Sequence, residues 1–317
     1  MKKRAFQLKK KRAGWIIFLI KLARQWPLLA LCAPALILTV IFKYVPMYGI
    51  LIGFKNYRPN RGVWGSEWLD PVMQNFIRFF DSPNCWRIIG NTFKIGIITL
   101  LFTYPAPIIF AVALNEIRCR WFKRSVQTIS YIPHFVSVVV LVGMLTSFAS
   151  VDGMFNMIRG AFGLPAVNMN EGDAYFLLMY VGSAVWQGIG WGSIIYLSAL
   201  SNVDTFLYDV ADVDGAGRWQ KIRHIVLPAI MPTTMVMLIL NTGSVLTQDY
   251  TKILLMQNDS NRSLIEVIST LVYRMGIEQG QFSYTTAVNL LVSVVSCVLV
   301  ASTNLIVRRI SPENSLW

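Results

Sequence analysis

A polar stretch between two hydrophobic segments decides the fold, and it reads Tyr208-Asp209-Val210-Ala211-Asp212-Val213-Asp214-Gly215-Ala216-Gly217-Arg218-Trp219, closing on Ile225-Val226-Leu227-Pro228. Asp204 can accept a hydrogen bond from the free amides of a first helical turn, which predicts a helix over 203–213. Gly215 ends that helix, because glycine adopts a positive φ without strain. A second helix is predicted from about Arg218 to Pro228, where proline fits the first turn of a following span. The stretch therefore predicts a compact knob of two short helices.

The composition is that of an integral membrane protein. The 317 residues are 55% hydrophobic and only 14% charged, whereas a soluble domain carries about 25% charged residues. A helix needs about 20 apolar residues to cross the bilayer core. Six windows meet this length, at roughly 27–52, 89–114, 126–148, 174–199, 228–248 and 286–307. We therefore expect an all-α integral membrane fold with six transmembrane helices. Prolines in the first two windows predict kinks, which either mark an internal path or are harmless.

The basic residues predict the orientation of the chain. The net charge is +13, and nine of the 29 Lys and Arg residues lie within the first 25 positions. This pattern is typical of a cytoplasmic flank rather than of a nucleic-acid-binding face. The loop 115–125 and the end after residue 307 are also basic, so we expect both termini and the loop 200–227 in the cytoplasm.

Three regions are predicted along the chain. They are a basic N-terminal segment, 1–25, lying partly along the inner membrane face, a six-span membrane domain, 26–310, and a cytoplasmic tail, 311–317. The first apolar run is too long for a signal peptide. The four cysteines are scattered and the two histidines lie far apart, so neither a disulfide framework nor a metal site is predicted. No phosphate-binding loop is present, so we expect no nucleotide bound to this chain.

Polar residues within two windows predict a solute path. Polar groups in a span are costly and usually face a cavity or another helix. The predicted path residues are Ser183, Trp186, Gln187 and Trp191 in the fourth window and Asn241, Ser244 and Gln248 in the fifth. The last three are spaced i, i+3, i+7, which places them on one helical face. Amides, hydroxyls and aromatic rings suit a sugar. The alternative is that they hydrogen-bond neighbouring helices, at about 0.6 kcal/mol each.

The opening stretch resembles the cytoplasmic coupling loop of permease subunits in type I binding-protein-dependent ABC importers. In that family Glu-Ala-Ala is followed by three residues, a Gly, and about nine more residues to Ile-x-Leu-Pro. Here Asp209 replaces the Glu and Val210-Ala211 the Ala pair, while Gly215 and Leu227-Pro228 are in place. The resemblance implies that Asp209, Ala211 and Gly215 contact an ATPase subunit or form a hinge, with Asp214 and Ala216 beside them.

Other segments look like the branch of that family that carries oligosaccharides and polysaccharide fragments. They are Gly49–Tyr57, Asn91–Phe93, Pro105–Pro107, Leu114–Glu116 and Tyr131–Phe135. The resemblance implies a non-enzymatic permease in a bacterial inner or plasma membrane. Its expected partners are a second homologous permease, two ATP-binding subunits carrying ATP and Mg, an external solute-binding protein and the lipid bilayer, but no nucleic acid. Alternatives are a same-fold permease for another solute, such as an amino acid, or a membrane-anchored sensor or enzyme.

Overall fold

The structure is a computed structural model that describes residues 25–316, and this part of the chain is helical, with one isolated antiparallel bridge between Lys55 and Trp68. In chain order the helices are α2 (Trp26–Thr39), η1 (Val40–Tyr44), η2 (Val45–Phe54), α3 (Gly62–Gly65), α4 (Gln74–Phe80), α5 (Cys85–Thr103), α6 (Pro105–Asn115), α7 (Arg120–Tyr131), η3 (Ile132–Phe135), α8 (Val138–Phe148), α9 (Met154–Ala161), α10 (Asp173–Ser201), α11 (Phe206–Val213), α12 (Arg218–Lys221), η4 (Ile222–Val226), α13 (Leu227–Gly243), α14 (Tyr250–Met256), α15 (Arg262–Ile265), α16 (Ile268–Tyr273), η5 (Arg274–Glu278), α17 (Phe282–Ile310) and η6 (Pro312–Asn314). The predicted all-α class is confirmed. The predicted basic segment falls on residues 1–24, which lie outside the described part of the chain.

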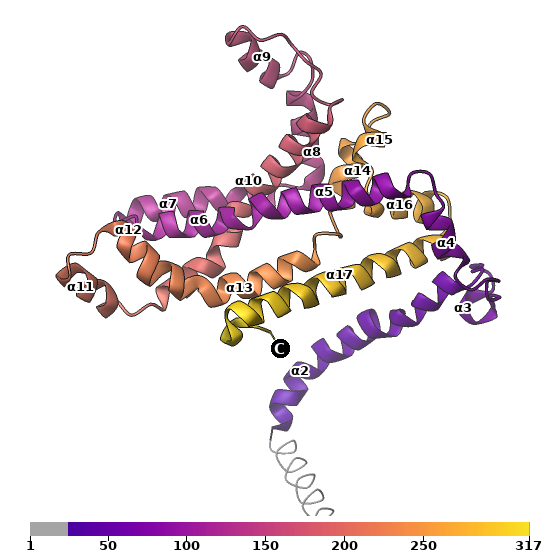
Figure 1. Ribbon diagram of the computed structural model, residues 1–317, viewed down its shortest axis with the longest axis horizontal. Coiled ribbons are helices and arrows are strands. Elements are labelled where there is room, and N and C mark those ends of the chain that lie inside the picture. The colour runs from indigo at the N-terminus through magenta and orange to yellow at the C-terminus, as the bar shows by residue number, and fades with distance from the viewer. Residues whose placement is uncertain (1–24, 317) are drawn as a thin grey trace, which may run out of the picture.

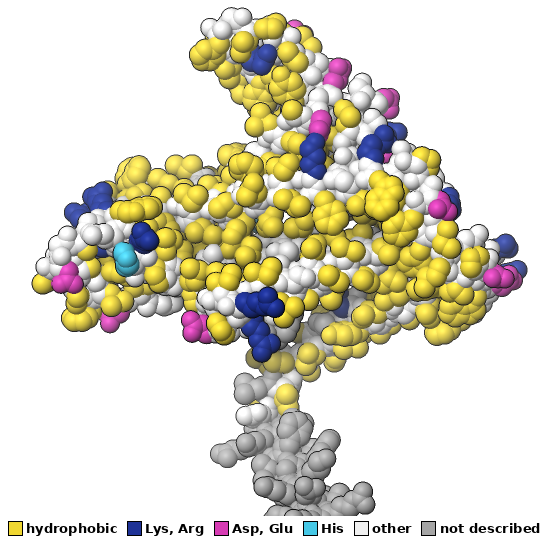
Figure 2. All heavy atoms as spheres, viewed as in Figure 1, with side chains coloured by type: hydrophobic (Ala, Val, Ile, Leu, Met, Phe, Trp, Pro, Cys, Tyr) yellow, Lys and Arg dark blue, Asp and Glu magenta, His cyan; other side chains and the backbone are white. Residues whose placement is uncertain are grey.

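The long helices run side by side along the long axis of the molecule (Figure 1). Helix α11 lies at one end, and α3 and α4 lie at the opposite end. Helices α8, α9, α14 and α15 project to one side, and α2 diverges from the other helices (Figure 1). Figure 2 shows hydrophobic side chains over the middle of the molecule and charged ones mainly near its ends. This distribution is what a lipid-embedded body requires.

Four helices are long and apolar enough to cross a membrane, namely Leu29–Phe54, Cys85–Asn115, Arg218–Gly243 and Phe282–Ile310. A fifth span results if the bent pair Arg120–Phe135 and Val138–Phe148 counts as one. Helix α10 is 29 residues long but is not among them, because its glycine, serine, tyrosine and tryptophan residues dilute the aliphatic ones. A multi-pass fold is confirmed, but the predicted six spans are not reached by length and hydropathy.

The predicted third window, 126–148, is broken near its middle. Helix α7 ends at Tyr131, a short 3-10 turn follows, and α8 begins at Val138, at 94° to the preceding helix. Pro133 lies in the turn and has no amide to continue a helical ladder. The Ser137 hydroxyl then accepts a bond from the amide of Val140 at 3.4 Å and caps α8. The window therefore forms two helices and one sharp bend.

Two glycines allow backbones to pack closely. A Cβ at Gly190 of α10 would lie 2.1 Å from the carbonyl oxygen of Ser130 in α7. A Cβ at Gly96 of α5 would lie 2.0 Å from the carbonyl oxygen of Val245, just after α13. Neither position has room for a larger side chain, so both glycines are sites of close backbone packing.

A hydrophobic cluster fixes the end of the bundle that carries α11. Val226 at the end of η4 and Ile230 of α13 are buried together with Tyr196 of α10, and Tyr208 of α11 packs against the same cluster. Helix α11 is therefore attached to the spans by packing as well as by the chain.

Candidate functional site

The predicted knob is present as a helix closed by a left-handed glycine. Helix α11 begins at Phe206, later than predicted, because the Asp204 carboxylate accepts the Phe206 amide at 2.9 Å in a preceding turn. Gly215 has φ +71°. Its amide donates to the Asp212 carbonyl at 3.1 Å, and the Ala216 amide donates to the Ala211 carbonyl at 2.8 Å. This pair of bonds is the usual closure of a helix that ends in a left-handed glycine.

The two parts of the knob are tied to each other and to a membrane span. Lys221 of α12 forms an ion pair with Asp212 of α11. The Gly217 amide donates to the Gln220 side-chain oxygen at 2.6 Å, which caps the start of α12. From there the chain stays helical from Arg218 to Gly243, through one π-helical turn, η4. The second half of the knob, residues 204–221, is therefore continuous with α13.

The knob presents an uncovered apolar face. No residue of α11 is buried. Phe206, Val210 and Val213 are spaced i, i+4, i+7, which places them on one face, and Val213 is 87% exposed. Of the five predicted coupling residues, Asp209, Asp214 and Gly215 are exposed, whereas Ala211 and Ala216 are half-buried. Clustered apolar side chains at an exposed end, rimmed by carboxylates, are typical of a protein-binding surface.

The predicted path residues of α10 separate into two groups, with Gln187 and Trp191 at the bend before α8 and Ser183 and Trp186 at another cavity. The buried Ser183 hydroxyl donates within its own helix, to the carbonyl of Tyr180 at 3.1 Å. Gln187 donates to the Val136 carbonyl at 3.1 Å and so holds the bend before α8. The Trp191 ring stacks on His134 in the same bend, with ring centroids 4.6 Å apart.

Trp186 of α10 lies apart from that bend. Its side chain is 49% exposed and lines a cavity of about 760 Å³ between α8, α9 and α10, which Ser183 also lines. The structure thus gathers only Gln187 and Trp191 at the bend.

The prediction that Asn241, Ser244 and Gln248 share one helical face is wrong. Helix α13 ends at Gly243 with Ser244 as its C-cap, because glycine is a poor helix former and serine bonds local backbone instead. Asn241 donates to the Met237 carbonyl at 2.7 Å, and Ser244 donates to the Asn241 carbonyl at 2.8 Å. Gln248 lies beyond the helix.

Gln248 instead connects the segment after α13 to α5. Its amide nitrogen donates to the Thr92 carbonyl at 2.6 Å, and its side-chain oxygen is buried without a hydrogen-bond partner among residues 25–316. One half of this amide therefore holds two segments together, and the other half is an unused acceptor.

A buried lysine that the sequence analysis missed lies beside Gln187. A cavity of about 350 Å³, which we call the bend cavity, is lined by His134, Val136, Val138, Tyr180, Ala184, Gln187, Gly188, Asp249 and Lys252. Lys252 of α14 is only 5% exposed and donates to the Tyr180 carbonyl at 3.1 Å. Burial lowers the pKa of Lys252 to about 8, although nearby Asp249 raises it. The signal was a lone lysine directly before the apolar run Ile253–Met256.

Comparisons with known proteins bear on this arrangement. Residues 103–312 match the family described as binding-protein-dependent transport system inner membrane component. Protein LplB of Bacillus subtilis (strain 168) is 41% identical, with 94% of this chain and 93% of that protein covered. The polygalacturonan/rhamnogalacturonan transport system permease protein YteP of the same organism is 39% identical, with 93% and 92% covered.

Solved structures extend the likeness to the fold. A chain of a bacterial ABC transporter involved in the import of the acidic polysaccharide alginate superposes with a TM-score of 0.83 at 34% identity. The match covers 93% of this chain and 99% of that one. The bacterial alginate ABC transporter in complex with its alginate pentasaccharide-bound periplasmic protein gives a TM-score of 0.82 at 34% identity, covering 92% and 97%. This chain therefore belongs to the family of inner-membrane components of binding-protein-dependent transport systems, as a multi-pass permease subunit.

Proposed function

We propose that this permease forms, with a second homologous permease subunit, the path for an oligosaccharide delivered by an external solute-binding protein. The printed names of the relatives support a carbohydrate, since they refer to polygalacturonan, rhamnogalacturonan, arabinooligosaccharides and alginate. A non-sugar solute, such as an amino acid, has no such support.

One observation carries the proposal, namely the exposed knob that continues as a single helix into α13. Two separate ATP-binding subunits would each hold one permease by its knob and supply the energy from ATP and Mg bound on their side. In this chain the contacts fall to Asp209, Asp214 and the apolar face of α11, while Ala211, Gly215 and Ala216 shape the turn. Closure of the ATP-binding subunits would then tilt α13 against its neighbours and alternate access to the path.

The topology of the proposal has six spans with both termini in the cytoplasm. The bent pair α7–α8 and the long helix α10 supply the fifth and sixth spans beyond the four that hydropathy identifies. The basic loop 115–125 lies near the knob end of α6, as a cytoplasmic loop should. Helix α2 exposes apolar side chains along its length, which lipid and the second permease would cover.

The bend cavity is the proposed part of the path in this subunit. Gln187 and Asp249 offer amide and carboxylate groups, Lys252 offers an ammonium, and His134, held by stacking on Trp191, offers a ring. Sugars bind through this combination, because their hydroxyls pair with polar groups and their ring faces stack on aromatic side chains. Ser183, Trp186, Asn241, Ser244 and Gln248 remain predicted contributors that would need another conformation to reach the solute.

Reconstituted transport tests the proposal. Proteoliposomes would contain this chain, the second permease and the ATP-binding subunits, and ATP-driven uptake of labelled oligosaccharides supplied with the binding protein would be measured. Val213→Asp should lower uptake at least tenfold without affecting folding, because Val213 is 87% exposed in the chain alone. Val151→Asp, a matched change in an exposed loop far from α11, should leave uptake intact. Equal uptake in both variants would show that the knob is not the binding site of the ATP-binding subunit.

A further inference from the structure

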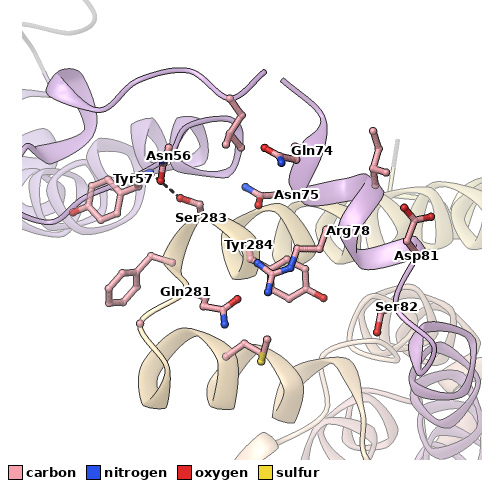
Figure 3. A pocket seen from close by; sticks show the side chains of 15 residues that line it. Asn56, Tyr57, Gln74, Asn75, Arg78, Asp81, Ser82, Gln281, Ser283 and Tyr284 are labelled. Carbon is pink, nitrogen blue, oxygen red and sulfur yellow. Dashed lines mark hydrogen bonds between the residues drawn. The ribbon is translucent and has the colours of Figure 1, made fainter. Parts of the chain in front are cut away.

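A polar pocket lies between α4 and the start of α17 (Figure 3). Figure 1 places these two segments at the end of the molecule opposite the knob. Its volume is about 950 Å³, within the range of pockets that enclose small ligands. The lining includes the amides of Asn56, Gln74 and Gln281 and the rings of Tyr57 and Tyr284. None of the residues predicted for coupling or for the path lines it.

One cation in this pocket is held in place yet unpaired. The Arg78 guanidinium lies over the Tyr284 ring, 4.8 Å from its centroid. Among the described residues it forms no ion pair. Figure 3 shows Arg78 extending from α4 over Tyr284, while the Asp81 carboxylate is directed away from the guanidinium. Stacking on a ring fixes a guanidinium and leaves its N–H edge free for a carboxylate.

The same pocket contains an unused acceptor. Gln281 donates its side-chain amide to Gln279 at 3.1 Å, but its side-chain oxygen is buried and has no hydrogen-bond partner in the described structure. An unsatisfied buried acceptor destabilises the structure, and a ligand hydroxyl that donates to it would remove this penalty. The pocket thus offers N–H donors for a carboxylate and an acceptor for a hydroxyl.

We infer that this α4–α17 pocket binds a uronic acid unit of the transported oligosaccharide, with its carboxylate on Arg78 and a ring hydroxyl on Gln281. A uronic acid carries both groups on one ring, whereas an Asp or Glu side chain of a partner protein carries only the carboxylate. The inference rests on the proposed function, because the pocket lies at the outer face only if the knob and both termini are in the cytoplasm. It also narrows the substrate of that function to an anionic oligosaccharide, which the permease would bind at the outer end of the path.

Binding to the intact importer tests the inference. The chain would be purified with its second permease and ATP-binding subunits, without the solute-binding protein, and titrated calorimetrically with tetragalacturonate and with neutral maltotetraose. The wild type should bind tetragalacturonate at least tenfold more tightly than maltotetraose. Arg78→Gln should weaken tetragalacturonate binding at least tenfold, Arg78→Lys less, and Gln281→Leu several-fold.

A matched control distinguishes the general loss of one positive charge from the loss of a carboxylate contact at Arg78. Arg87→Gln removes an exposed cation whose side chain bonds Asn84 at 3.0 Å and does not line the pocket, so it should leave the affinity unchanged. Unchanged affinity in Arg78→Gln, or no preference of the wild type for tetragalacturonate, overturns the inference. It is also overturned if Arg78→Gln weakens only the docking of the solute-binding protein, since the carboxylate then belongs to that partner.

These outcomes are distinct from failure of the proposed function. If the importer takes up only neutral oligosaccharides, the proposed function stands and the uronate site fails. If the wild type takes up no oligosaccharide under ATP, the proposed function fails whatever Arg78 binds.

Discussion

Gly215→Ala should uncouple the knob from the ATP-binding subunits, and the structure gives the size of the effect. Gly215 has φ +71°, and no atom lies within 4 Å of the Cβ that alanine would add. The whole cost is therefore backbone strain, about 1–2 kcal/mol for an L-residue in the left-handed region. If that strain opens the turn between Ala211 and Ala216, the docked form of the knob loses population by about 5–30-fold.

Two measurements on the purified complex would check this effect. The affinity of the ATP-binding subunit for the permease should fall by the same factor, and ATP hydrolysis should lose its dependence on the loaded binding protein. Gly217→Ala is the matched control, because Gly217 has φ −71° and its added Cβ would meet only Gln220 at an ordinary 3.7 Å. Equal affinity and equal coupling of ATP hydrolysis in the two alanine variants would show that the ATP-binding subunit does not depend on the left-handed turn.

Three further predictions concern the packing of α10, α14 and the segment after α13. Gly190→Val should lower the stability of the detergent-solubilised chain by more than the ~1–3 kcal/mol of ordinary overpacking, because its Cβ would lie 2.1 Å from a backbone oxygen. Gly188→Val is the control and should leave the melting temperature unchanged, because no atom lies within 4 Å of the Cβ at that position. Equal melting temperatures of the two variants would refute the close contact at Gly190. Lys252 has a folded pKa of about 8 against 10.5 unfolded, so the unfolded chain binds more protons between these values and the free energy of unfolding should rise with pH there. Relative to Lys252→Met, wild-type stability should therefore improve from pH 7 to 10, and parallel pH curves would contradict the burial. Gln248→Leu should destabilise the chain by about 1 kcal/mol through the lost bond to the Thr92 carbonyl, and uptake that falls without loss of stability would restore its predicted role in the path.

The sequence was sufficient for features that depend on local chemistry. A glycine between two helix-forming runs predicts a left-handed turn, and Gly215 adopts it. Long apolar runs predict helices, and α5, α13 and α17 lie within or around their windows. Asp204 predicts a bond to a first-turn amide, and Phe206 supplies that amide.

Features that depend on tertiary contacts could not be predicted in the same way. The spacing of Asn241 and Gln248 places them on one face only if α13 continues past both residues. Helix α13 instead ends at Gly243, and the chain after it packs closely against α5 at Gly96. Lys252 was overlooked because a lone lysine before an apolar run does not by itself reveal that α14 packs against α10 and buries it. Arg78 gains its interest only from Tyr284, about 200 residues away in the sequence and adjacent in space.

Crosslinking at Val213 tests the central claim most directly. Val213→Cys would be placed in a chain whose native Cys32, Cys85, Cys119 and Cys297 are replaced, so that the new thiol is the only one. If the knob binds the ATP-binding subunit, this thiol should react with a membrane-impermeant reagent only from the cytoplasmic side. It should also crosslink to the ATP-binding subunit in the assembled importer. Labelling from the outside, or an assembled and active importer without that crosslink, would contradict it.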